Sequence, residues 1–124
     1  MKNKGQEETA VQVGRKYEEL AAEYLKKQGY RILERNYRCR KGEIDLIGIQ
    51  EGYLCFVEVK YRSSGEFGGS LGAVDLKKQR RICGAALYYL MEKGYGSDTA
   101  CRFDVAGISR QGVELITNAF EFRR

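Results

Sequence analysis

The chain has 124 residues, 43% of them hydrophobic, with a net charge of +5, four cysteines and no histidine. This length and composition fit one globular domain with a single core. The lack of histidine excludes histidine-based acid–base catalysis, catalytic triads and most zinc sites, and the scattered cysteines contain no CxxC pair.

The first ten residues are polar and aperiodic, and we expect them to be a flexible N-terminus ahead of one domain over residues 11–124. They lack the apolar core of a signal peptide, and no later stretch is apolar enough to span a membrane, so we expect a cytoplasmic protein. Apolar spacing from Val13 to Gln28 predicts an amphipathic helix. On it, Glu18 lies at the margin of the apolar stripe, and Glu19 points into solvent.

Alternating side chains next predict three strands, at residues 30–38, 43–49 and 53–62. Glu51-Gly52 is typical of a hairpin turn between the second and third strands. A period of two places Phe56, Glu58 and Lys60 on one face of the third strand.

Residues 63–72, SSGEFGGSLG, predict a mobile loop beside the candidate site. A second helix is expected from Asp75, its N-cap, to Lys93, with Gln79 on the inward stripe. Two final strands are expected at 101–108 and 113–116. The order α-β-β-β-α-β-β predicts an α/β sandwich around a central mixed sheet.

Carboxylates interrupt the apolar runs of two neighbouring strands, Asp45 in GEIDLIGI and Glu58 in YLCFVEVKYR. Burying a charge costs on the order of several kcal/mol unless a partner or a metal offsets it. Both acids can reach one Mg²⁺ or Mn²⁺, with the Val59 carbonyl as a further ligand and Glu18 completing the metal shell. Lys60 would orient the attacking water or stabilise developing charge.

Structural roles are the alternative for these residues. Glu58, Lys60 and Asp45 would then pair with one another, and Gln79 would be a buried amide satisfied by the backbone.

Basic residues cluster at 31–41 and in KKQRR, residues 77–81. Such clusters suit a polyanion, most often nucleic acid, and a solvated surface is the alternative. The candidate phosphate-binding residues are Arg35, Arg38, Arg40, Lys41, Arg62, Lys77, Arg80 and Arg81.

Six segments carry a resemblance to a known family: GRKYEELA, GEIDLI, FVEVKYR, VDLKKQRR, RFDV and NAF. From Gly14 to Phe120 the chain resembles the bacterial YraN-like family, which is similar to the PD-(D/E)XK nucleases and, among them, to archaeal Holliday-junction resolvases. The resemblance implies a restriction endonuclease-like three-layer sandwich with an α-β-β-β-α-β core, Mg²⁺ dependence and cleavage of DNA.

Residue by residue, Asp45, Glu58 and Lys60 match the signature of that superfamily. Glu18 matches its first-helix acid, and Gln79 matches a polar residue on the second core helix of some members. Ile44 stands where the motif has proline.

We therefore expect an endonuclease dependent on Mg²⁺ or Mn²⁺ that acts on DNA, with branched or damaged DNA as candidate substrates. The resemblance to resolvases also suggests a homodimer. The alternative is a non-catalytic nucleic-acid-binding or partner-scaffold module with a vestigial site.

Overall fold

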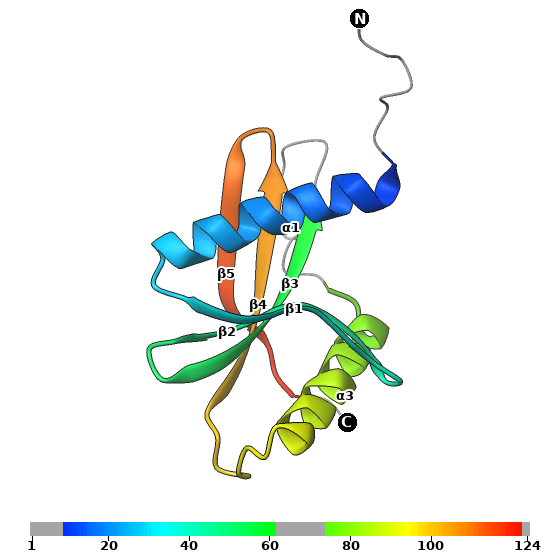
Figure 1. Cartoon of the computed structure of the whole chain (residues 1–124), viewed down its shortest axis with the longest axis vertical. Coiled ribbons are helices and arrows are strands. Elements are labelled where there is room, and N and C mark those ends of the chain that lie inside the picture. Colours follow the sequence, from blue (N-terminus) through cyan, green and yellow to red (C-terminus); the bar gives the residue numbers. More distant parts are fainter. Residues whose placement is uncertain (1–8, 62–73, 123–124) are drawn as a thin grey trace, which may run out of the picture.

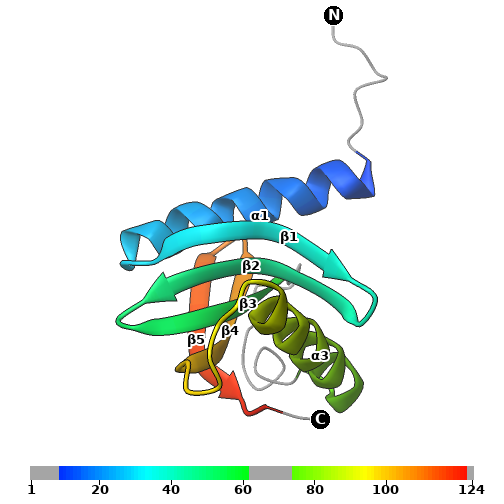
Figure 2. The same ribbon diagram turned by 60° about the horizontal axis from the view of Figure 1, so that its bottom comes forward.

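In the part of the chain that the structure describes, a five-stranded sheet has one helix on each face (Figures 1 and 2). The structure, a computed structural model, describes residues 9–61 and 74–122. In chain order the elements are α1 (Ala10–Lys27), β1 (Arg31–Cys39), β2 (Gly42–Gln50), β3 (Tyr53–Tyr61), α3 (Leu76–Glu92), β4 (Cys101–Ser109) and β5 (Gly112–Phe120). This order and the three layers confirm the predicted fold class. The loop expected at residues 63–72 and the candidate Arg62 lie outside the described residues.

The strands lie side by side in sequence order. Neighbouring pairs are antiparallel except β3 and β4, which are parallel and are joined through α3. A parallel pair needs a long crossover, and the helix supplies it. Glu51 and Gly52 both have positive φ, 52° and 83°, as a tight hairpin between β2 and β3 requires.

Local side-chain signals set the helix ends. Thr9 caps α1 in a capping box, with the Gln12 N–H donating to Thr9 Oγ1 (3.1 Å) and the Thr9 N–H donating to Gln12 Oε1 (2.8 Å). Thr9 and Ala10, expected in the flexible N-terminus, therefore belong to the helix. Asp75 caps α3 as predicted, because its Oδ1 accepts the Lys78 N–H at 2.8 Å. Neither described helix is long and apolar enough to cross a membrane.

The core is divided by the sheet into two clusters. On the α3 side, Phe56 packs with residues that include Ile44, and on the α1 side Val57 packs with residues that include Leu46 and Leu25. Phe56 and Val57 therefore face opposite ways, as the period of two predicts for β3.

The regular pairing of β2 with β3 stops at Leu46 and Val57. Beyond that point the Asp45 side chain replaces a backbone partner, because its Oδ2 accepts the Val59 N–H at 2.8 Å. Ile44 and Leu46 belong to opposite core clusters, so the alternation of β2 shifts at Asp45. The strands consequently diverge at the position where the candidate acids lie.

The beginning of β2 lies directly against α3. A Cβ atom at Gly42 would stand 2.9 Å from the backbone oxygen of Arg81, closer than real Cβ contacts allow. Glycine therefore permits an approach that brings the β1–β2 hairpin beside the first turns of α3.

Candidate functional site

A cavity of about 260 Å³ lies where β2 and β3 diverge, between α1 and the beginning of α3. It is lined by Gly14, Tyr17, Glu18, Asp45, Glu58, Val59, Tyr61 and Lys78. The structure thus brings together Glu18, Asp45, Glu58 and Val59, which the sequence analysis selected from three separate segments. The neighbouring Glu19 is exposed, as expected.

Two aromatic rings form one wall of this cavity. Tyr17 of α1 and Tyr61 at the end of β3 stack with their centroids 4.3 Å apart and their planes 8° from parallel. Stacking of this kind holds the end of β3 against α1. Neither tyrosine was among the residues that the sequence analysis selected for the site.

The Asp45 carboxylate has an unfavourable position for a negative charge. The pKa of Asp45 is raised from 3.8 to about 8, mainly by burial and then by the negative charges of Glu58 and Glu18. The hydrogen bond from the Val59 N–H lowers this pKa but does not outweigh them. Glu58 itself is only 8% exposed. Additional positive charge in this cavity would therefore favour the ionised form of Asp45.

Lys78 of α3 brings a positive charge to the acids of this cavity. Its Nζ lies 3.1 Å from Glu58 Oε2, and its side chain remains 48% exposed. Burial disfavours the charged ammonium, but the charges of Glu58 and Asp45 outweigh it, so the pKa of Lys78 is raised. The sequence analysis included Lys77 among the candidate residues but not Lys78. The predicted N-cap at Asp75 was the available signal, because it places Lys78 in the first turn of α3.

Two of the expected catalytic residues stand outside the cavity lining. Lys60 follows Glu58 on β3 and is partly buried, but it does not line the cavity. Gln79 is buried on α3, as predicted, and its amide donates a 2.6 Å hydrogen bond to the carbonyl of Val74. That bond is the backbone satisfaction named as the alternative for Gln79.

The oxygen donors suit a hard divalent cation. Among the described residues, no three Asp, Glu, Cys or His side chains converge into a metal cage. Mg²⁺ does not need one, because it is commonly held by one or two carboxylates together with waters and substrate phosphate. Asp45 and Glu58 fit this pattern, and the raised pKa of Asp45 indicates that added positive charge would be favourable there.

Two further hollows adjoin the cavity and carry cations. One shares Lys78 with it and contains Arg38 and Arg81, and the other shares Glu18 with it and contains Arg38 and Arg15. Arg38 therefore lines both hollows at the edge of the acidic site. Arg15 carried no signal in the sequence analysis.

The remaining basic candidates are dispersed over the surface. Arg35 forms an ion pair with Glu19 on α1, away from the cavity. Lys41 and Arg80 line a different groove along α3. Arg40 and Lys77 are exposed and line none of these hollows.

A second aspartate in an apolar strand has a different environment. Asp104 of β4 is fully buried, and its carboxylate accepts hydrogen bonds from Arg102 at 3.0 and 3.1 Å, from the Tyr30 hydroxyl at 2.7 Å and from the Asn118 N–H at 2.9 Å. A counter-charge and full hydrogen bonding explain its burial. Asp104 is therefore a structural acid, whereas the largest charge effect on Asp45 comes from another carboxylate, that of Glu58.

Comparison with known proteins identifies the family of this chain. The model of the uncharacterised protein family UPF0102 matches residues 17–108. The chain belongs to this family. The UPF0102 match spans the cavity residues from Tyr17 to Lys78, and it confirms the family expected from GEIDLI and FVEVK.

Relatives from distant bacteria have the same family name. A UPF0102 protein of Lachnoclostridium phytofermentans is 52% identical over 82% of this chain and 86% of its own. Another, of Chlorobium chlorochromatii, is 53% identical over 82% of this chain and 77% of its own. A third, of Pseudomonas entomophila, is 42% identical over 87% of this chain and 92% of its own. The relatives are thus matched over most of their length.

Proposed function

We propose that this UPF0102 chain is an endonuclease that uses Mg²⁺ or Mn²⁺ to hydrolyse phosphodiester bonds in DNA. The observation that carries the proposal is the meeting of Asp45 and Glu58 in one cavity, where burial and mutual repulsion raise the pKa of Asp45 to about 8. Such an arrangement destabilises the metal-free fold, and a divalent cation would relieve it.

Each residue has a distinct role in this proposal. Asp45, Glu58 and the Val59 carbonyl would hold the metal, together with Glu18. A bound Mg²⁺ or Mn²⁺ would supply an activated water and neutralise charge on the phosphate. Lys78, held beside the cavity by Glu58, stabilises the negative charge that increases as the phosphate is attacked. Lys60 is the second candidate for that role, since it follows Glu58 by two residues on β3.

The flanking cations suit the DNA backbone. Arg38 lines the two hollows beside the acids, and Arg15 and Arg81 extend the basic surface to either side. Contacts of this type position a duplex without reading its sequence. We therefore propose that the protein recognises the shape of branched or damaged DNA and not its base sequence. We further propose that it acts in the cytoplasm as a homodimer.

A specific observation favours the alternative of a binding module without activity. Lys60 and Gln79, both expected in the catalytic set, do not line the cavity, and the Gln79 amide is bonded to Val74. In that case the acids would be a vestige and the cations would still bind nucleic acid.

The deciding experiment is incubation of the protein with linear, nicked, flapped and four-way DNAs, with Mg²⁺, Mn²⁺ or EDTA. We expect cleavage of at least one substrate with metal only, and its loss in Asp45→Asn and Glu58→Gln. Glu114→Gln, which changes an exposed glutamate on β5, is the matched control and should cleave like wild type. Metal-free wild type should still bind.

Two outcomes would contradict the proposal. Binding to every DNA without cleavage of any, in both metals, would identify the binding module. Cleavage that persists in Glu58→Gln at the wild-type rate would come from a contaminating nuclease and not from this site.

A further inference from the structure

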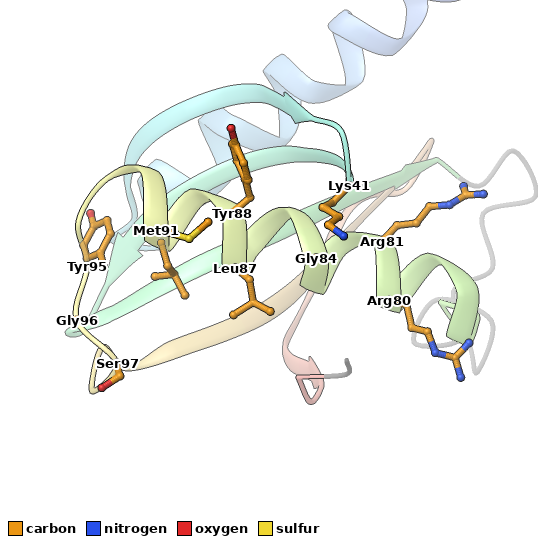
Figure 3. A pocket seen from close by; sticks show the side chains of 11 residues that line it. Lys41, Arg80, Arg81, Gly84, Leu87, Tyr88, Met91, Tyr95, Gly96 and Ser97 are labelled. Atoms are coloured by element: carbon orange, nitrogen blue, oxygen red, sulfur yellow. The ribbon is translucent and has the colours of Figure 1, made fainter.

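The outer side of α3 carries a separate hollow, a groove of about 820 Å³, which we call the α3 groove. Figure 3 shows its lining, with Leu87, Tyr88 and Met91 on the C-terminal half of α3 and Tyr95 beyond the helix end. The groove does not share a residue with the cavity around Asp45 and Glu58. It therefore needs an explanation of its own.

The apolar part of this groove is unusually open to solvent. Met91 is 72% exposed, Tyr88 43%, Leu87 39% and Tyr95 36%. On a surface helix these positions are normally polar, because the apolar stripe faces the core. Apolar side chains gathered in one hollow, and not scattered singly, indicate a surface that another molecule covers.

The charged residues in the described lining of the groove are all basic and lie at one end. Lys41, Arg80 and Arg81 line the end toward the beginning of α3, and no Asp or Glu of residues 9–61 and 74–122 lines the groove. The nearest acid on the helix, Glu92, accepts a 2.7 Å hydrogen bond from the Tyr37 hydroxyl of β1. None of the three cations forms an ion pair with another described residue. The groove thus has an apolar half and a basic half.

This asymmetry selects among possible occupants. A second copy of the chain placed on the groove by two-fold symmetry would bring the basic half of each groove against the apolar half of the other. The described lining contains no acid that could pair with these cations. Nucleic acid needs cations along its whole path, and here they are confined to one end. An acidic partner with large apolar side chains matches both halves.

We propose that the α3 groove is a docking site for a short peptide segment of another protein that carries Asp or Glu at one end and large apolar residues along the rest. From Arg80 to Met91 the helix rises about 16 Å, which three turns of a bound helix or about five extended residues would span. Gly84, at the middle of the groove, lets the Lys41 side chain lie close to α3, since a Cβ there would stand 3.1 Å from Lys41 Cβ. The docked protein would bring the chain to its site of action, independently of the activity proposed above.

The test is selection of displayed random peptides of about 11 residues, the length of three helical turns, on the full-length protein. We expect the selected peptides to combine an acidic cluster with two or more large apolar residues. Binding of a labelled selected peptide should weaken about tenfold or more with Met91→Glu and with Arg80→Glu. Leu20→Glu, which alters a leucine that is 48% exposed on α1, is the matched control and should bind normally.

Other results would overturn the proposal. Failure to enrich acidic, apolar peptides, or binding that Met91→Glu leaves unchanged, would remove the groove as a peptide site. Dimerisation that Met91→Glu abolishes would assign the surface to a second copy. Loss of DNA binding in Met91→Glu would assign it to nucleic acid.

Discussion

Replacing Asp45 by asparagine should stabilise the metal-free protein, and increasingly so as the pH rises. Asparagine keeps the size of the side chain and an oxygen to accept the Val59 N–H, but it carries no charge. In the wild type, burial and the charge of Glu58 raise the pKa of Asp45 from 3.8 to about 8. The folded protein then holds a proton that the unfolded chain has released, so the free energy of unfolding falls as pH rises from about 4 to about 8.

The size of the effect follows from that pKa. Each tenfold change in an ionisation constant is worth about 1.4 kcal/mol, so a pKa near 8 sets an upper limit of about 6 kcal/mol. Asp45 is partly exposed at the cavity, and Lys78 beside Glu58 reduces the repulsion, so we expect a gain of about 2–3 kcal/mol at pH 8. For a chain of 124 residues this corresponds to a rise in Tm of roughly 8–12 °C.

Thermal and urea unfolding in EDTA at pH 4, 6 and 8 would measure this difference. Asp45→Asn should equal wild type at pH 4 and exceed it progressively above. Asp104→Asn is the matched control, because it removes a strand carboxylate that accepts hydrogen bonds from Arg102 and should cost about 3–5 kcal/mol. A loss of stability in Asp45→Asn, or a difference that does not change with pH, would refute the reasoning and indicate a structural ion pair.

Three further predictions concern ligands. Mg²⁺ or Mn²⁺ at about 100 times its Kd should stabilise wild type at pH 8 by about 2.7 kcal/mol, and should not stabilise Glu58→Gln in the same titration. Lys78→Met should reduce DNA cleavage by about 10²-fold or more with little change in DNA affinity, and Lys60→Met should have a smaller effect on the cleavage rate. Arg38→Gln should weaken binding of all DNA sequences alike and reduce the slope of log K against log salt by about 1.

Each of these has a result that would count against it. Calorimetric titration without heat at millimolar Mn²⁺ would exclude the metal site. A larger loss of cleavage in Lys60→Met than in Lys78→Met would return the strand lysine to the catalytic role. Binding of DNA by wild type that is independent of salt would make Arg38 an ordinary surface residue.

Much of the fold was predictable because its signals are local. Apolar spacing identified both described helices, and Glu51-Gly52 identified the hairpin between β2 and β3. The five strands of the described sheet were expected in the correct order, but the last was predicted too short, because β5 continues past Ile116 to Phe120. The beginning of α1 was predicted three residues late, at Val13 and not at Ala10. The reciprocal bonds of Thr9 and Gln12 extend the helix there, and a polar, aperiodic segment hides such a cap.

The candidate site was only partly predictable, because its residues meet through long-range contacts. Alternation along β3 correctly placed Glu58 on the face of Phe56, and by the same rule it favoured Lys60 as the catalytic cation. The structure adds Lys78 of α3 as a candidate beside Lys60, because it lies 3.1 Å from Glu58 across a sequence separation that no local pattern spans. The close approach of α3 to the β1–β2 hairpin, which Gly42 allows, decides this contact.

By itself, the sequence determined the order of the elements, the two faces of β3 and the presence of acids within apolar runs. The tertiary structure alone decided which charges surround those acids. Asp45 and Asp104 have similar local sequences, and each accepts an N–H from a neighbouring strand, at 2.8 and 2.9 Å. Asp104 lies against the Arg102 guanidinium, whereas Asp45 faces Glu58 across the gap between β2 and β3. Because the free energy of a buried carboxylate depends on the charges packed around it, only the folded neighbours separate the structural acid from the candidate metal ligand.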